Sequence, residues 1–293
     1  MICVDLGSNT LRACEMDDAL RIGKRAEIIV GSAAGLSEKG LAKAAMERVR
    51  AGVEQIVSEF DFSRDYKAVA TEAFRVSPNA GAFFDEIERD FGVKFDIIDP
   101  ALEASLTRLG IENRAAALGL DVSRSLSVDL GGASTEACFG EVSRSFRFGI
   151  VRFWEACNCN ASECEKRAPA IVAEAKAFVS QFKFESVILT SGVPTTVAAI
   201  LSGMDYANYD PERINGAKLT LEDFARAREI IEKAADADAL VGAGRAGLVI
   251  AGICLLSALL KDAQKPFIVI DDGLREGVGV ACARSILNKR RKK

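Results

Sequence analysis

The sequence predicts an α/β protein with two domains, and three observations carry that prediction. The chain has 293 residues, of which 49% are hydrophobic and 27% charged, a balance typical of folded proteins with room for two domains. Apolar strands alternate with segments of helical spacing, as in α/β proteins. A strand ending in Asp-Leu-Gly occurs twice, at Asp5 and Asp129, 129 − 5 = 124 residues apart, which is the size of one domain. We therefore expect domain I over residues 1–120 and domain II over residues 121–279, with a C-terminal helix at about 280–293 packed back on domain I.

Three predicted strands open the first half. Residues 2–6 form a short apolar strand, residues 11–16 its hairpin partner and residues 26–30 a third strand, which indicates the antiparallel part of a mixed sheet. In residues 36–60, apolar side chains recur at helical spacing and charged side chains occupy the positions between them. This segment is therefore predicted to be an amphipathic helix.

The remainder of the first half alternates strands and helices, in the order strand 67–70, helix 79–91 and strand 93–98. Asp99 followed by Pro100 predicts the start of another helix, because Asp is a good N-cap and Pro suits the first helical position. This helix should end near residue 118. Glu103 then lies in its first turn, where a carboxylate interacts favourably with the helix dipole.

The second half repeats this plan. Its first part is predicted to contain strands at 126–130, 135–139 and 143–148, a helix at 162–182, a strand at 186–189, and a turn at 190–196 leading into a helix through 201. Ser162 and Glu165 are predicted to form a capping box. The last part is predicted to contain a loop at 208–217, helices at 220–237 and 243–261, a strand at 266–270 and a helix from 274.

The stretch from residue 125 to residue 137 carries the strongest chemical signal. Its strand ends in Asp129, and small residues, hydroxyls and a second carboxylate follow: Gly131, Gly132, Ala133, Ser134, Thr135 and Glu136. Small residues let a turn bring its N–H groups against a ligand, and such groups beside hydroxyls suit a phosphate. Two carboxylates at the turn suit a phosphate-bound Mg²⁺. The alternative is a β-hairpin whose Gly-rich turn binds nothing.

A second copy of the motif favours the phosphate interpretation. Asp5 is followed by Leu6, Gly7, Ser8, Asn9 and Thr10, which repeats the order of carboxylate, glycine and hydroxyl. Two domains that each open on such a turn could face each other across a cleft and hold one polyanion between them.

Composition and charge exclude several classes of protein. The net charge of −4 provides no general basic field, so we expect no nucleic-acid partner. Asp5 and Glu15 interrupt the first apolar stretch, which argues against a signal peptide. The apolar run at 246–260 is too short to span a bilayer comfortably and is predicted to be a buried helix. We expect a cytoplasmic protein with no membrane partner, and a homodimer is left open.

The eight cysteines are predicted to be reduced and mostly buried. Cys157, Cys159 and Cys164 lie close in sequence, but the chain has no histidine and no fourth thiol nearby, so a metal or redox role there is not favoured. The basic residues 289–293 are expected to form a solvated helix end, with an accessory contact to a polyanion as the alternative.

Six motifs in order resemble the exopolyphosphatase / guanosine pentaphosphate phosphohydrolase (Ppx/GppA) family over nearly the whole chain. They are Asp5 to Arg12, Ala70 to Arg75, Glu103 with Ala104, Val128 to Glu136, Ser191-Gly192 with Thr195-Thr196, and Gly273 to Gly277. Each motif alone is weak, and the six in the family's order are specific.

The resemblance implies two actin-like (ribonuclease H-like) domains of the ATPase superfamily, with the active site in the cleft between them. It implies removal of the terminal phosphate from polyphosphate, or of the 5′-phosphate from guanosine pentaphosphate. Long members of the family add a domain built on histidine–aspartate chemistry. With no histidine and its last residue at 293, the chain resembles the short two-domain form.

The resemblance also implies roles for individual residues. Glu103 would be the general base that deprotonates the attacking water. Asp129 and Glu136, with Asp5 close by, would hold Mg²⁺ or another divalent cation. The phosphates would contact Gly7, Ser8, Asn9, Arg12, Arg75, Gly131, Gly132, Ala133, Ser134, Ser191 and Gly192. Arg12 is equally consistent with a surface arginine on a hairpin.

The chain departs from the family pattern at Leu102, Ala133 and Val193, where a carboxylate, a glycine and a small or hydroxyl residue are usual. Three interpretations follow. The favoured one is an exopolyphosphatase, since repeated phosphate loops can hold a chain of phosphates without recognising a base. The second is a guanosine pentaphosphate 5′-phosphohydrolase that uses the same site, and the third is a non-hydrolysing polyphosphate- or alarmone-binding regulator.

Overall fold

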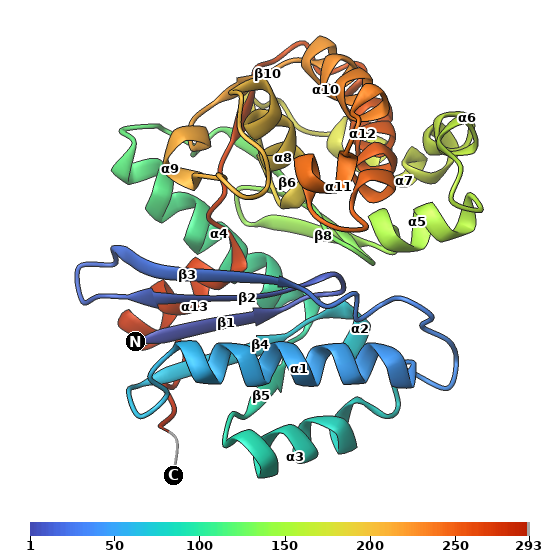
Figure 1. Ribbon diagram of the computed structural model, residues 1–293. Helices are drawn as coiled ribbons and strands as arrows, with labels where there is room; N and C mark the ends of the chain where they lie inside the picture. The colour runs from blue at the N-terminus through green and yellow to red at the C-terminus, as the bar shows by residue number, and fades with distance from the viewer. Residues whose placement is uncertain (292–293) are drawn as a thin grey trace. The chain divides into compact units, whose positions relative to one another are not determined.

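The computed structural model describes residues 1–291 and divides into two compact α/β units (Figure 1). Unit 1 contains Met1–Asn113 and the C-terminal segment from Asp272, and unit 2 contains Arg114–Asp271. The chain therefore leaves unit 1 within one helix and returns to it just before the last helix.

The sheet of unit 1 has five strands in the order β3-β2-β1-β4-β5. Its strands are β1 (Ile2–Leu6), β2 (Thr10–Met16), β3 (Ile22–Ile29), β4 (Tyr66–Ala70) and β5 (Phe95–Ile97). The first three pair antiparallel, whereas β4 and β5 extend the sheet in parallel from β1. The carboxyl ends of β1, β4 and β5 consequently meet at one edge, where ligands bind in many parallel α/β sheets.

The sheet of unit 2 has the same strand order with one strand added, β10-β11-β9-β6-β7-β8. Its strands are β6 (Ser125–Leu130), β7 (Thr135–Phe139), β8 (Val142–Phe146), β9 (Ser186–Thr190), β10 (Lys218–Leu219) and β11 (Phe267–Val269). Again a meander of three antiparallel strands continues into two parallel ones, and β10 closes the edge in antiparallel pairing. The expected fold class is confirmed, because both units have the strand order of a ribonuclease H-like domain.

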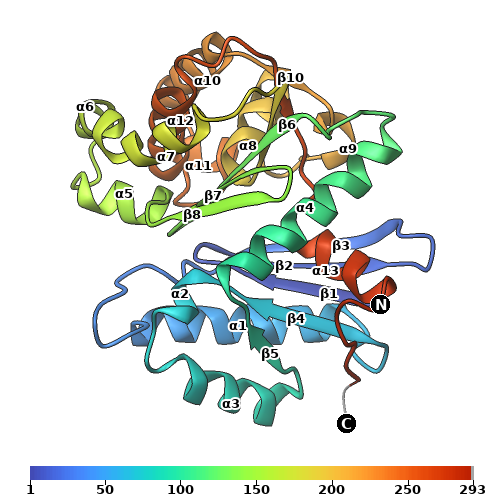
Figure 2. The same cartoon turned by 180° about the vertical axis from the view of Figure 1, so that it is seen from behind.

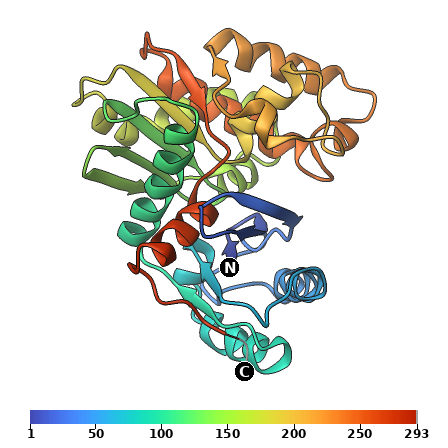
Figure 3. The ribbon, with the colours of Figure 1, turned by 90° about the vertical axis from the view of Figure 1, so that its left-hand side faces the viewer.

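Helices cover both faces of the unit 1 sheet: α1 (Lys43–Glu59), α2 (Glu72–Arg75), α3 (Ala80–Phe91), the start of α4 (Pro100–Ala117) and α13 (Leu274–Ala283). Figure 3 shows α1 and α13 on opposite sides of the sheet. On one face α1 approaches β2 and β3 so closely that a Cβ on Gly52 would lie 3.1 Å from Leu11.

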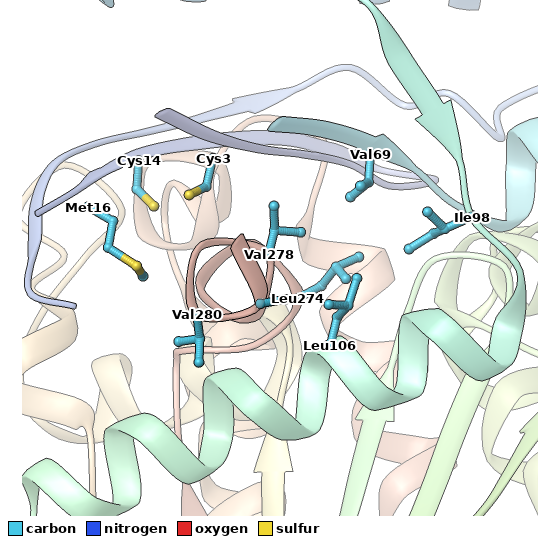
Figure 4. Packing of buried hydrophobic residues seen from close by; sticks show 10 residues of the cluster. Cys3, Cys14, Met16, Val69, Ile98, Leu106, Leu274, Val278 and Val280 are labelled. Carbon is cyan, nitrogen blue, oxygen red and sulfur yellow. The ribbon is translucent and has the colours of Figure 1, made fainter. Parts of the chain in front are cut away.

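On the other face, α13 lies between the sheet and α4, and its side chains complete a buried cluster with Cys3, Cys14, Val69 and Leu106 (Figure 4). Hydrophobic burial of this kind is the main source of stability in such a core. It also ties the C-terminal helix to the first strand of the chain.

The helices of unit 2 gather around α12: α5 (Ile150–Ala156), α6 (Ala161–Ile171), α7 (Ala173–Val179), α8 (Gly192–Leu201), α9 (Pro211–Ile214), α10 (Leu221–Lys233), α11 (Ala237–Val241) and α12 (Ala246–Leu260). The helix α12 packs against α5, α6, α8 and α10, and Figure 2 shows α6 and α7 beside it. Its prediction as a buried helix is confirmed. In the described part of the chain, no helix has both the length and the apolar character needed to cross a bilayer.

Several predicted helix boundaries were wrong. The segment 162–182 is two helices, α6 and α7, and α5 precedes them where no helix was expected. The cap of α6 is Asn160, whose side chain accepts from the Glu163 N–H at 3.0 Å, not the predicted box of Ser162 and Glu165. The turn at Asn158 and Cys159 has φ of 51° and 55°, and this left-handed turn fixes where α6 begins.

Three further segments also differ. The first helix begins at Lys43, after turns at residues 31–40, and not at 36. The loop 208–217 contains α9, capped by Asp210 with Pro211 at its first turn. The segment 220–237 ends its helix at Lys233, and α11 follows separately.

The C-terminal segment was predicted to be helical to its end, which was wrong for the residues that the structure describes. The helix α13 ends at Ala283, and Arg290 forms an isolated antiparallel bridge with Tyr66. The predicted solvated helix end also included residues 292 and 293, which lie outside the described residues.

Candidate functional site

In the turn after β1, the carbonyl groups accept hydrogen bonds from a neighbouring segment of unit 1. The backbone N–H groups of the same peptides therefore point in the opposite direction. The Gly7 N–H donates to the Thr10 carbonyl at 2.9 Å, which closes the turn. The Gly7 carbonyl accepts from the Ser32 Oγ at 3.0 Å, and the Ser8 carbonyl accepts from the Ala33 N–H at 2.8 Å. A trans peptide holds its C=O and N–H on opposite sides, so the N–H groups of Ser8 and Asn9 point away from that segment.

The turn after β6 is built in the same way. The Gly131 N–H donates to the Ser134 carbonyl at 2.9 Å, and the carbonyls of Gly131 and Gly132 accept from the N–H groups of Ile150 and Val151 at 3.0 and 2.8 Å. Gly131 and Gly132 follow Gly7 and Ser8 by the same 124 residues that separate the two aspartates (131 − 7 and 132 − 8). The sequence repeat is thus a repeat of hydrogen bonds as well.

Close backbone packing stabilises this second turn. A Cβ on Gly149 would lie 2.5 Å from the Ala133 nitrogen and 2.6 Å from the Gly131 oxygen, so only glycine fits there. Ala133 is 1% exposed, which places the methyl group of this departure from the family pattern inside the unit. The Thr135 hydroxyl, in contrast, donates to the Phe148 carbonyl at 2.8 Å and serves the fold.

Asp129 and Glu136 are direct partners across the antiparallel pair of β6 and β7. Directly opposite side chains share a face of the sheet and lie within contact distance. The Ser145 hydroxyl donates to Glu136 Oε1 at 2.7 Å and orients this buried carboxylate. The equivalent pair in unit 1 is Asp5 with Arg12. The position that Glu136 occupies in unit 2 is therefore occupied by an arginine in unit 1.

These carboxylates fit a Mg²⁺ ion only in part. Within residues 1–291, no group of three or more Cys, Asp or Glu side chains is placed to hold a metal. The predicted trio is divided between the units, with Asp5 in unit 1 and Asp129 and Glu136 in unit 2, so it stays a prediction. Mg²⁺ typically uses one or two carboxylates and completes its shell with water and substrate phosphates. The Asp129–Glu136 pair fits that requirement.

Glu72, Arg75 and Glu103 form a buried ion-pair network at the carboxyl edge of the unit 1 sheet, with side chains 10%, 12% and 11% exposed. Arg75 Nη1 donates to Glu103 Oε2 at 2.5 Å and to the Ile98 carbonyl at 2.8 Å. Arg75 Nε and Nη2 both donate to Glu72 Oε2, at 3.2 and 2.9 Å. The Arg75 fork predicted to bind phosphate is therefore occupied by protein groups in this structure.

Electrostatics keep Arg75 charged. Burial lowers the pKa of Arg75, but the carboxylates of Glu103 and Glu72 outweigh burial and leave that pKa above its ordinary value.

The predicted start of α4 holds Glu103 in place. Asp99 Oδ1 accepts from the Leu102 N–H at 2.8 Å, and the Asp99 carbonyl accepts from the Glu103 N–H at 3.0 Å.

Arg12, the second predicted phosphate ligand among the arginines, is partly buried on β2. Its Nε donates to Glu27 Oε2 at 2.9 Å, and its side chain is 19% exposed. Arg12 is therefore partly buried and held by an ion pair, and it is not a solvated surface arginine.

The turn after β9 combines strain with a buried hydroxyl. Ser191 has φ 86° and ψ 172°, a conformation that usually requires glycine, and α8 begins at the next residue, Gly192. The Ser191 Oγ is buried and has no hydrogen-bond partner among the described residues. Strained backbone and an unsatisfied hydroxyl at a helix N-terminus are both expected where an anion binds.

Sequence reasoning missed four residues that support these turns and side chains: Ser32, Glu72, Ser145 and Gly149. Glu72 had a local signal, since it lies three residues before Arg75 at the start of a helix. The other three act through contacts between segments far apart in sequence, which no local pattern reveals.

Comparison with known proteins agrees with this geometry. Residues 29–285 match the Ppx/GppA phosphatase family. A curated relative, guanosine-5′-triphosphate,3′-diphosphate pyrophosphatase from Pseudoalteromonas translucida, is 29% identical over 94% of this chain and 57% of its own length. The chain spans about half the length of the curated relatives it matches.

Solved structures match over nearly their whole length. An exopolyphosphatase-like protein superposes with a TM-score of 0.82 at 24% identity, covering 98% of this chain and 99% of the other. An Aquifex aeolicus member of the Ppx/GppA family superposes with a TM-score of 0.73 at 25% identity, covering 97% of each chain. The family model matches residues 29–285, which is most of the chain, so the chain belongs to the Ppx/GppA phosphatase family.

Proposed function

We propose that this phosphatase releases terminal orthophosphate from inorganic polyphosphate with the help of Mg²⁺. The observation that carries the proposal is the duplicated turn, in which the carbonyls of residues 7–8 and 131–132 are bonded to the protein and the amides are turned away from those contacts. Such amides bind phosphate oxygens without recognising a base, so they suit a repeating polyanion.

The reaction would be hydrolysis of one phosphoanhydride bond. Water attacks the terminal phosphorus, its proton passes to Glu103, and the bridging oxygen leaves with the shortened chain. Unit 1 would supply Glu103 and Arg75, together with the turn at Gly7–Asn9. Unit 2 would supply the turns at 131–134 and 191–192, with Asp129 and Glu136 as the carboxylates for Mg²⁺, whose charge neutralises phosphate oxygens when it is bound.

A second candidate is hydrolysis of the 5′-phosphate of guanosine pentaphosphate. It is favoured by the curated relative, which is named for that nucleotide. The same hydrolysis would serve both substrates. The preference between them would depend on which residues bind the part of the substrate that is not cleaved, a phosphate chain in one case and a nucleoside in the other.

The decisive experiment measures phosphate release from long polyphosphate, tripolyphosphate and guanosine pentaphosphate at one salt concentration, with and without Mg²⁺. We expect a lower KM for long polyphosphate than for tripolyphosphate, and a smaller difference at high salt because screening weakens each phosphate contact. A KM for guanosine pentaphosphate far below that for long polyphosphate would favour the nucleotide. Tight binding without any release would favour the regulator interpretation.

A further inference from the structure

Glu72 is a buried carboxylate to which the proposed reaction gives no role. It begins α2, and its Oε2 accepts two hydrogen bonds from Arg75, three residues later in the same helix. A buried charge is costly unless it is paired, so Glu72 and Arg75 stabilise each other in place.

Arg75 is shared unequally between two carboxylates. Its Nε and Nη2 both donate to Glu72, whereas only Nη1 donates to Glu103. Glu72 lies on the same short helix as Arg75, but Glu103 comes from α4, 28 residues along the chain. The contact to Glu103 can therefore open without any change within α2.

The closed contact engages the two proposed roles with each other, because Nη1 could bind a phosphate oxygen and Glu103 Oε2 could receive a proton from water. Nη1 and Oε2 lie 2.5 Å apart, so this N–H and this oxygen are bonded to each other and neither is available to substrate or water until the contact opens. A phosphate oxygen competes well for the guanidinium, because arginine binds phosphate with strong charge-assisted hydrogen bonds.

We infer that Glu72 is a positioning residue that holds Arg75 while Nη1 exchanges Glu103 for an oxygen of the terminal phosphate. Arrival of the phosphate then releases the base that the reaction needs. The inference rests on the proposed function, because it concerns the same site.

The first test is Glu72→Gln, which keeps the shape and an acceptor oxygen but removes the charge. Arg75 is then neutralised by Glu103 alone, and this pair becomes harder to open. We expect kcat on long polyphosphate to fall about tenfold with KM changed less than threefold, since other contacts hold the chain. An active enzyme whose kcat does not respond to Glu72→Gln overturns the inference and leaves the proposed function intact.

A double mutant separates positioning from a general structural effect. If Glu72 acts through Arg75, adding Glu72→Gln to Arg75→Gln should leave kcat within about twofold of Arg75→Gln alone. The inference is contradicted if kcat of the double mutant falls by the product of the two single-mutant losses. The matched control is Asp90→Asn, which removes a carboxylate paired with Arg50 at 2.5 Å in the same unit, and it should leave kcat unchanged. An equal loss in this control means that the effect of Glu72→Gln is not specific.

A binding measurement tests the inference even if the protein hydrolyses nothing. In Glu103→Gln the phosphate no longer competes with the charge of Glu103 for Arg75 Nη1, so tripolyphosphate should bind at least about threefold more tightly by calorimetry. Adding Glu72→Gln to this variant should weaken binding again, because Arg75 loses its anchor. Equal affinity of the wild type and Glu103→Gln overturns the inference. Absence of hydrolysis with this tightening present rejects the proposed reaction alone.

Discussion

Gly277 on α13 lies directly against the backbone carbonyl of Leu106 on α4. A Cβ built on Gly277 would stand 1.7 Å from that oxygen, and one on Gly110 of α4 would stand 2.1 Å from the Gly273 oxygen. The two helix backbones are therefore in contact, and the gap between them admits no side chain. Since α4 carries Glu103 in its first turn, the packing of α13 helps to fix the candidate base.

Gly277→Ala should destabilise the protein by about 3 kcal/mol, because the added methyl group meets backbone atoms and the helices must separate. Gly81→Ala on α3 is the control, since nothing lies within 4 Å of its Cβ, and replacing a helical glycine should stabilise by about 0.5–1 kcal/mol. Urea unfolding of the two variants measures both effects. Similar stability of both variants would show that the contact between α4 and α13 relaxes easily.

Local signals in the sequence were sufficient for the strands and turns that carry the candidate site. The hairpin of β1 and β2 follows from an apolar strand, the Gly7 turn and a second apolar strand. The start of α4 follows from Asp99 and Pro100, and it places Glu103 in the first turn, as predicted. These features depend on residues a few positions apart, and the local conformations that these residues favour are the ones found in the folded protein.

Features that depend on long-range packing could not be predicted. The contact of Arg75 on α2 with Glu103 on α4 depends on the register in which β4 and β5 pair, because each helix follows one of these strands. The cap of α6 depends on a left-handed turn at Asn158, so Ser162 matched the capping pattern without serving as the cap. The tail at Arg290 reads as a helix end from its charges, but it pairs with β4 instead.

Glu103→Gln should reduce kcat by about a hundredfold or more without weakening substrate binding, because it keeps the shape of the side chain and removes the proton acceptor. Glu112→Gln is the matched control. Glu112 lies on the same helix, is half exposed and pairs with Arg108 at 3.7 Å. Phosphate release under saturating substrate measures both variants. Turnover at the wild-type rate in Glu103→Gln would place the base elsewhere.

Removal of divalent metal should abolish phosphate release, because the negative phosphate oxygens would lack a neutralising charge. Asp129→Asn and Glu136→Gln should each raise the Mg²⁺ concentration needed for half-maximal rate, since each removes one of the two carboxylates on the face of β6 and β7. Titration of Mg²⁺ into EDTA-treated protein measures this shift. Full activity in EDTA would contradict the metal assignment.

The basic end of the described chain forms ion pairs with other residues of unit 1. Arg290 donates to Asp96 at 2.7 Å, and Arg291 donates to Asp65 at 2.6 Å. Lys67 of β4 donates to the other oxygen of Asp96 at 2.5 Å. Asp96 therefore joins β5, β4 and the C-terminal segment. In this structure the two arginines are engaged in ion pairs that stabilise the fold, and a polyanion would have to compete with these pairs.

Asp96→Asn should destabilise the protein at neutral pH and have less effect in acid. Burial raises the pKa of Asp96, but hydrogen bonds from Lys67 and Arg290 outweigh it and hold the pKa below its ordinary value. A lowered pKa in the folded state means that the carboxylate stabilises the fold above the unfolded pKa of about 3.9, and that this contribution is lost as the pH falls through the lower folded value. The difference in unfolding free energy between wild type and variant should therefore be constant from about pH 7 to pH 5 and shrink below about pH 4. Urea unfolding at several pH values measures it, with Asp262→Asn as the control for an exposed ion pair to Lys176. A difference that stays constant into acid would show that packing of the Asp96 side chain, and not its charge, stabilises this junction.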